Sequence, residues 1–367
     1  MKFTIRQDQL VYPLQMVGGI VEKRHATPIL SNILIRVTPQ QLSITGTDLE
    51  VEMITHININ NGEPGETTLP ARKMIDICRA LPAEADIEVY ANEGRATIRS
   101  GKSRFTLSTL PSSEFPELNQ AADSFEFSLG QCELKQLIDN TSFSMAQQDV
   151  RYFLNGICME IGEGSLRTVA TDGHRLALCS LPFKQTVDEE YQIIIPRKAI
   201  IELSRLLCEQ GDSVTVQIGS NHVKFLFPSQ VFSAKLIDGQ FPDYQRVIPV
   251  NNSNKLTADR TDFLQALRRV SILSNEKHRS IRLNFSENRL RILAHNQEQE
   301  EAEEELQVQY HGEDLEIGFN VTYLLDALQA VHEQEVTILF GDSNSSCLIG
   351  CTGGQTESSY VVMPMRL

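Results

Sequence analysis

The sequence lacks any long apolar segment. The N-terminal MKFTIRQDQL has no continuous apolar stretch, and no run of 18 apolar residues occurs in the 367-residue chain. A secretory signal needs an apolar core, and a transmembrane helix needs about 20 apolar residues. We therefore expect neither export nor membrane spanning. With 41% hydrophobic and 22% charged residues, the composition is that of an ordinary globular chain.

Paired cysteines and metal-binding motifs are also missing. The seven cysteines are odd in number and scattered, and none forms a C-x-x-C pair. The eight histidines show neither H-x-x-x-H nor H-E-x-x-H spacing. These absences favour buried, reduced thiols in a cytoplasmic protein over disulfides. We expect no metal and no cofactor.

No catalytic motif is convincing. The GKS at 101–103 would need a glycine at Ala96 and a following helix to be a phosphate loop, but RFTLSTL is typical of a strand. Asp172 and His174 could form an acid–base pair, yet no nucleophile motif accompanies them, and Asp172 recurs as Asp48 without a histidine. The more economical interpretation of Asp172 is a turn residue that binds local backbone amides. The sequence predicts no catalytic residues.

Positive net charge is absent as well, since the formal charge is −15. Basic residues nevertheless gather on the expected helices, as in Arg72, Lys73 and Arg79, whereas acidic residues are densest at 298–305. A basic helix is more often simply a solvated face. The alternative is a weakly positive surface that contacts phosphates without reading sequence.

What the sequence has is a repeat that covers its whole length. LSITGTDLEVEM at 42–53, LRTVATDGHRLA at 166–177 and LRILAHNQEQEE at 290–301 begin 124 residues apart. This spacing aligns Asp48, Asp172 and Asn296. A unit of this length can enclose its own core. We predict three domains, with boundaries at 1–124, 125–252 and 253–367.

Each unit combines helices with strands. Apolar residues at helical spacing, such as Leu10, Leu14 and Val17, precede each block, and the segments 70–81, 196–207 and 320–331 predict a second helix per unit. Alternating apolar segments at 29–37, 86–100, 213–227, 281–293 and 335–350 predict strands. The fold class is therefore α+β, with helices packed on antiparallel sheets.

The C-terminal SYVVMPMRL is unusually apolar for a tail. Tyr360, Val361 and Val362 could form a last edge strand, whereas the segment 363–367 is harder to explain as structure alone. Methionines favour adaptable binding surfaces.

Several motifs together resemble one family from MKFT to MRL. They are FSMAQQDVRYFLNG at 143–156, TDGHRLA at 171–177, FPDY at 241–244, RVIP at 246–249, ILSNEK at 272–277, EQEEAEE at 298–304 and the terminal YVVMPMRL. The chain resembles the bacterial replicative sliding clamps, the β subunits of DNA polymerase III. The resemblance implies three tandem clamp domains and a head-to-tail homodimeric ring around double-stranded DNA. It also implies no catalytic activity, and tethering of the polymerase catalytic subunit, the clamp loader, other polymerases and repair proteins.

The resemblance further implies three sets of site residues. The partner-peptide groove would comprise Leu154, Thr171, Gly173, His174, Arg175, Leu176, Pro242, Arg246, Val247, Tyr323, Ser346, Val361, Val362, Met363, Pro364, Met365 and Arg366. DNA would be contacted by Arg24, Gln148, Tyr152 and Phe153, where Phe153 replaces the family's tyrosine. The dimer interface would comprise Lys73, Arg104, Phe105, Ile272, Leu273, Glu298, Glu301 and Glu304.

Two other functions remain as alternatives at this point. One is an enzyme built on Asp172 and His174, which requires turnover of a small substrate. The other is a cytosolic three-domain scaffold that binds peptides without any role on DNA. Only a ring is trapped on closed circular DNA, so retention on such a circle separates these alternatives from a clamp.

Overall fold

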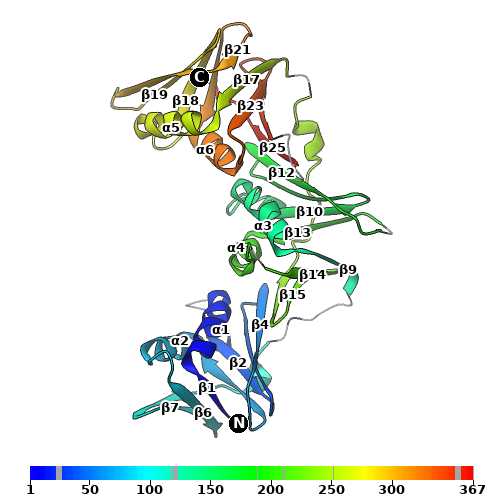
Figure 1. The fold of residues 1–367 in the computed structure, drawn as a ribbon, viewed down its shortest axis with the longest axis vertical. Helices are drawn as coiled ribbons and strands as arrows, with labels where there is room; N and C mark the ends of the chain where they lie inside the picture. Colours follow the sequence, from blue (N-terminus) through cyan, green and yellow to red (C-terminus); the bar gives the residue numbers. More distant parts are fainter. Residues whose placement is uncertain are drawn as a thin grey trace. The chain divides into compact units, whose positions relative to one another are not determined.

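The computed structural model describes residues 1–21, 27–116, 118, 123–187, 189–209, 211–250, 252–351 and 357–366. They form two compact units, one of Met1–Cys132 with Ile201–Leu236 and the other of Glu133–Ile200 with Ile237–Leu367. Helices and antiparallel strands occur in both units (Figure 1), which confirms the predicted α+β class.

The first unit contains an eight-stranded and a four-stranded sheet. The longer sheet has the order β5-β2-β3-β4-β16-β15-β14-β9 and the shorter the order β1-β6-β7-β8. The strands are β1 (Lys2–Arg6), β2 (Asn32–Val37), β3 (Gln41–Thr47), β4 (Val51–Asn58), β5 (Gly65–Pro70), β6 (Asp86–Asn92), β7 (Arg95–Ser100), β8 (Ser103–Ser108), β9 (Asp123–Gly130), β14 (Ser213–Gly219), β15 (His222–Phe227) and β16 (Gln230–Lys235).

The second unit contains a nine-stranded and a four-stranded sheet. Their orders are β13-β10-β11-β12-β25-β24-β23-β17-β21 and β20-β19-β18-β22. The strands are β10 (Gly156–Gly162), β11 (Ser165–Thr171), β12 (Arg175–Pro182), β13 (Tyr191–Pro196), β17 (Asn254–Asp259), β18 (Ser280–Ser286), β19 (Arg289–His295), β20 (Glu301–Gln307), β21 (Gln309–Tyr310), β22 (Leu315–Asn320), β23 (Glu335–Phe340), β24 (Cys347–Cys351) and β25 (Glu357–Val362).

Each long sheet is shared by two successive sequence repeats. In the first unit β4 pairs with β16, from Val51 opposite Ala234 to Thr55 opposite Gln230. In the second unit β12 pairs with β25, from Arg175 opposite Val362 to Ser180 opposite Glu357. Because continuous backbone ladders cross the repeat boundaries, the middle repeat is divided between the two units. The predicted domain ends at 124 and 252 therefore do not coincide with the compact units, and they stay predictions.

The helices lie where the apolar spacing predicts them. They are α1 (Gln7–Ile20), α2 (Ala71–Ala80), α3 (Gln131–Asp139), α4 (Arg197–Leu206), α5 (Arg260–Val270) and α6 (Val321–Ala330). In α5 the buried side chains include Phe263, Leu267 and Val270, the predicted stripe. The Asp259 carboxylate caps α5 by accepting a hydrogen bond from the Asp262 amide at 3.0 Å. None of the helices in the described ranges is long and apolar enough to cross a membrane.

Most strand predictions hold, with one exception at 29–37. There Pro28–Ser31 forms a 3₁₀ turn, η1, and the strand begins only at Asn32. Proline presets the backbone angle of a helical first turn, and this local constraint prevails over the apolar run. The segment 335–350 divides into β23 and β24 as a hairpin.

Aromatic packing fills the core of the second unit. The Phe285 and Phe340 ring centroids lie 4.4 Å apart, and Tyr310 lies 5.7 Å from Phe285 and 5.8 Å from Phe340. The three rings join strands of both sheets in that unit.

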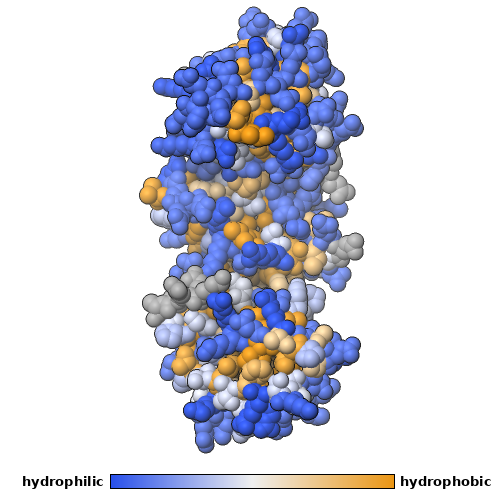
Figure 2. Space-filling view, turned by 90° about the vertical axis from the view of Figure 1, so that its left-hand side faces the viewer, coloured by the Kyte–Doolittle hydropathy of each residue, from blue (hydrophilic) through white to orange (hydrophobic). Residues whose placement is uncertain are grey.

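On the outside, one face of the molecule is largely hydrophilic with scattered hydrophobic areas (Figure 2).

We expect Phe285→Ala to destabilise the chain by about 3–5 kcal/mol, because it leaves a cavity beside Tyr310 and Phe340. A urea titration should show a lower unfolding midpoint. Tyr12→Ala provides the control, because Tyr12 is 53% exposed and its loss should change stability by less than about 0.5 kcal/mol. Equal midpoints for Phe285→Ala and the unmodified chain would contradict this account of the core.

Candidate functional site

The turn between β11 and β12 carries four of the predicted groove residues. The Asp172 Oδ1 accepts hydrogen bonds from the backbone amides of His174 at 2.9 Å and Arg175 at 3.0 Å. The Thr171 hydroxyl donates to the Arg175 carbonyl at 2.6 Å and accepts from the Gly173 amide at 3.0 Å. The prediction that Asp172 binds local amides is confirmed. Its carboxylate serves the turn, not a catalytic imidazole.

The same turn occurs at the equivalent place in the first repeat. The Asp48 Oδ1 accepts from the amides of Glu50 at 2.9 Å and Val51 at 2.7 Å, and the Thr47 hydroxyl donates to the Val51 carbonyl at 2.9 Å. The residue after the aspartate has a left-handed backbone in both turns, with φ of 78° at Leu49 and 89° at Gly173. Glycine adopts this conformation at little cost, whereas leucine does not.

The predicted tail is an integral part of the nine-stranded sheet. β25 lies between β12 and β24, so it is an interior strand and not the edge strand that the sequence left open. Beyond it, the Met363 amide donates to the His174 carbonyl at 2.9 Å, and the Met365 amide donates to the Gly318 carbonyl at 2.8 Å. The tail thus connects the turn of the middle repeat to β22 of the last repeat.

The predicted groove residues all lie in the second unit, at three levels of exposure. The buried ones are Leu154, Thr171, Leu176, Val361 and Val362. The partly buried ones are Arg175, Tyr323, Ser346, Pro364 and Met365, and the exposed ones are Gly173, His174, Pro242, Arg246, Val247, Met363 and Arg366. This gradation suits a surface with an apolar base and an accessible rim.

Three of the buried residues belong to one cluster. Leu154, Leu176 and Val361 pack together with Phe241 and Tyr244. The last two residues are not among the predicted site residues, although both lie in the FPDY motif.

Tyr244 holds the segment that carries Pro242, Arg246 and Val247. Its hydroxyl donates to the Glu160 carboxylate at 2.7 Å. Burial raises the pKa of Tyr244, and the hydrogen bond to Glu160 adds to the increase. The hydroxyl therefore stays a donor, which keeps the segment fixed on β10.

The loop 145–155 brings together three of the predicted DNA contacts. Tyr152 is 59% exposed, and its ring centroid lies 6.0 Å from that of Phe153. Phe153 packs against the buried cluster of Leu154, Leu176 and Val361, so it is partly structural. Gln148 has a φ of 56°. Arg24 lies outside the described residues.

Arg151 connects this loop to the β11–β12 turn. Its guanidinium binds both carboxylate oxygens of Asp149, at 3.0 and 2.9 Å, and donates to the Asp172 carbonyl at 3.3 Å. The hydrogen bonds from Arg151 lower the pKa of Asp149 to about 2. The ion pair therefore persists at neutral pH.

The predicted interface residues fall into two groups, one in each unit. In the first unit, Lys73 lies on α2, and Arg104 and Phe105 lie on β8, the last strand of its sheet among the described strands. In the second unit, Ile272 and Leu273 lie in η6 (Ser271–Leu273), which contacts β20. Ile272 is 75% exposed.

The glutamates of this group differ in their surroundings. Glu298 and Glu301 are exposed. Glu304 instead pairs with Arg269 of α5, with oxygen–nitrogen distances of 2.6 and 3.1 Å. Glu304 thus connects β20 to α5 of the same chain, so its predicted contact with a second chain would compete with this ion pair.

Four of the six cysteines that the structure describes are buried. Cys78, Cys158, Cys179 and Cys347 are buried, whereas Cys132 and Cys208 are exposed, contrary to the expectation of buried thiols. Burial raises the pKa of Cys78 and of Cys347 to about 12. Among the described residues, no group of three or more His, Cys, Asp or Glu side chains is arranged to hold a metal.

Comparisons with known proteins agree along the whole chain. Models of the N-terminal, central and C-terminal domains of the DNA polymerase III beta subunit match residues 1–119, 128–243 and 245–366. The chain is 50% identical to the beta sliding clamps of Pseudomonas aeruginosa and Escherichia coli K12, over 100% of both chains in each case.

Solved structures give the same result. The P. aeruginosa DNA polymerase III subunit beta superposes with a TM-score of 0.96 at 50% identity, and the Caulobacter crescentus pol III beta with 0.94 at 38%, each over 100% of both chains. The predicted arrangement of three tandem clamp domains is confirmed. The chain belongs to the DNA polymerase III beta subunit family, the beta sliding clamps, and is a non-catalytic accessory subunit.

Proposed function

We propose that two copies of this chain close into a ring around duplex DNA and tether the replicative polymerase and other DNA-processing proteins to it. The observation that carries the proposal is the full-length 50% identity to beta sliding clamps, with all three domains matched. The ring acts by topology and position, so it requires no cofactor. A cytoplasmic location follows from this role.

Closure of the ring is supported by complementary strand edges. β8 lies at one end of its sheet and carries the exposed Arg104, while β20 lies at one end of its sheet and carries the exposed Glu301. The unpaired backbone groups of an open strand edge can form hydrogen bonds with a strand of another chain. A heterologous contact between β8 of one copy and β20 of the other closes after two copies if their surfaces are related head to tail.

Sliding is supported by the charge balance. A chain of net charge −15 has little overall attraction for DNA, since nonspecific affinity depends on the number of phosphates that cations neutralise. Basic residues on α2, α4 and α5, among them Arg72, Arg205 and Arg268, offer a few weak contacts. Weak contacts permit movement along the duplex, and enclosure prevents loss.

Partner binding is supported by the β12–β25 junction. Its buried cluster of Leu154, Leu176 and Val361 provides an apolar base, and Val247 and Met363 are apolar side chains at the rim, 45% and 42% exposed. Such a surface suits a short peptide with a glutamine and one or two leucine or phenylalanine anchors. Solved clamps of P. aeruginosa and Bartonella birtlesii are bound to griselimycin, which is consistent with a ligand-binding surface in the family.

The function is tested on circular DNA. After loading onto a nicked circle by a loader ATPase, the chain should survive a moderate-salt wash and dissociate once the circle is linearised. A short linear duplex should bind weakly, with affinity falling steeply as salt rises. Equal retention on circular and linear DNA would refute enclosure and favour a peptide-binding scaffold. Gln148→Ala should weaken DNA contact and leave the dimer intact.

The double variant Ile272→Ala with Leu273→Ala should yield folded monomers at micromolar concentration. Exposed ion pairs contribute only about 0–1 kcal/mol each, so the apolar side chains should dominate the interface. Light scattering gives the mass. Val250→Ala is the control, because Val250 is 87% exposed but lies outside the predicted interface. A dimer of undiminished stability in the double variant would show that the interface lies elsewhere.

Removal of Met363–Leu367 should abolish tight peptide binding and leave the ring intact. The deletion removes the backbone hydrogen bonds from Met363 and Met365 but no residue of the predicted interface. A peptide that binds at ~1 μM has ~8 kcal/mol of binding free energy, and a few apolar anchors usually supply most of it. Fluorescence titration with a polymerase-derived C-terminal peptide measures the loss. Unchanged affinity would remove the tail from the partner site.

A further inference from the structure

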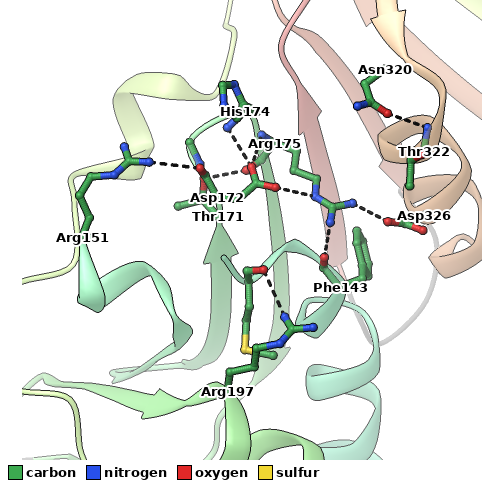
Figure 3. A network of polar contacts seen from close by, with 12 residues as sticks. Phe143, Arg151, Thr171, Asp172, His174, Arg175, Arg197, Asn320, Thr322 and Asp326 are labelled. Atoms are coloured by element: carbon green, nitrogen blue, oxygen red, sulfur yellow. Dashed lines mark hydrogen bonds and ion pairs between the residues drawn. The ribbon is translucent and has the colours of Figure 1, made fainter. Parts of the chain in front are cut away.

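The Arg175 guanidinium occupies an unusual position at the start of β12 (Figure 3). Its Nε donates to the Asp172 Oδ2 at 3.1 Å, its Nη1 to the Asp326 Oδ2 at 2.5 Å, and its Nη2 to the Phe143 carbonyl at 2.5 Å. Every nitrogen therefore has a partner within the chain. The side chain is only 12% exposed.

Aromatic rings cover the guanidinium as well. Its central carbon lies 4.6 Å from the centroid of Tyr323 and 5.6 Å from that of Phe143. Cations are attracted to ring faces at these distances. Because its nitrogens are hydrogen-bonded and two rings lie beside it, the guanidinium has little surface free to contact a bound peptide.

The side chains that contact Arg175 come from different parts of the predicted peptide-binding groove. Asp172 belongs to the turn that carries Gly173 and His174, whereas Asp326 and Tyr323 lie on α6 of the last repeat. One side chain thus sets the spacing between the turn and the helix. A planar guanidinium can fix such a spacing because its donors have a rigid geometry.

The first repeat shows that the turn itself does not need this arginine. There the equivalent position is the buried Val51, and Asp48 nevertheless accepts the same two backbone hydrogen bonds. The additional contacts of Arg175 must therefore serve something other than local turn formation. They reach α6.

Charge reinforces this conclusion. Asp172 and Asp326 are 18% and 29% exposed at the side chain, and Arg175 lies between them. Without a cation, two poorly solvated carboxylates would repel each other and drive the turn and the helix apart.

We propose that the Arg175 guanidinium has a positioning role in the peptide-binding groove, where it sets the separation of the Thr171–His174 turn and Tyr323 without itself contacting the bound peptide. This inference rests on the proposed peptide-binding function. It adds to the role that family resemblance implies for Arg175, because the guanidinium supports two walls of the groove from behind.

Arg175→Lys tests whether the planar guanidinium is needed, because lysine keeps the positive charge but cannot reach several acceptors with donors of fixed geometry. We expect peptide affinity to fall roughly tenfold, equivalent to one lost charge-assisted hydrogen bond. The loss should be the same for a series of peptides in which each polar side chain is replaced in turn by alanine. If Arg175 contacted one of those side chains, the loss would disappear for that peptide, and the proposal would be overturned.

Arg36→Lys is the matched control. Arg36 pairs with Glu66 at 3.0 Å in the first unit, which contains none of the predicted groove residues, and its side chain is 49% exposed. The affinity of this variant for the peptides should be unchanged. Should Arg175→Lys fold poorly, Asp326→Asn provides a second variant, which keeps the side-chain shape and should also weaken binding.

A second readout requires no peptide. In protein labelled with 3-fluorotyrosine, Tyr323→Phe assigns the fluorine resonance of Tyr323 among the eight tyrosines. Arg175→Lys should shift that resonance and leave the resonance of Tyr90 in place. An unshifted Tyr323 signal together with unchanged affinity would refute the positioning role. Failure of the unmodified chain to bind any peptide would instead refute the proposed function, so the two failures are distinguishable.

Discussion

Strand pairing across the repeats is the constraint on which the rest of the structure depends. Backbone hydrogen bonds are obligatory, so a strand edge exposed by one repeat must be paired or protected. Here β4 pairs with β16 and β12 with β25. Successive repeats consequently share a continuous sheet and are not structurally independent of one another. At each junction, the turn of one repeat lies beside the last strand of the next repeat.

The two junctions share a backbone but differ in side chains. The Lys235 amide donates to the Glu50 carbonyl at 2.8 Å at the first junction, as the Met363 amide does to the His174 carbonyl at 2.9 Å at the second. Only the second has an arginine that reaches a neighbouring helix, since Val51 stands in its place at the first. The two junctions therefore share the same backbone geometry, and the long side chain of Arg175 distinguishes the second junction from the first.

Local patterns explain what the sequence could predict. The helical spacing of Phe263, Leu267 and Val270 identified α5, and the recurrence of Asp48 and Asp172 identified the turns, because both depend on residues close in sequence. The contacts of Arg175 with Asp326 and Phe143 span 151 and 32 residues. Nothing in the local sequence indicates such contacts, so the family resemblance predicted Arg175 as a groove residue but did not predict these two partners.

The acidic segment illustrates the same limit for electrostatics. From composition, the glutamates at 298–305 form one block of repelling charge. In the folded chain, Glu303 pairs with Arg291, Glu304 with Arg269 and Glu305 with Arg289. These pairs neutralise charge within the sheet and helix of one chain, and the exposed glutamates of the segment outside them are Glu298, Glu300 and Glu301. The unpaired charge of the segment is thus smaller than the sequence indicates, and we therefore expect the exposed apolar Ile272 to contribute more than this charge to the proposed dimer.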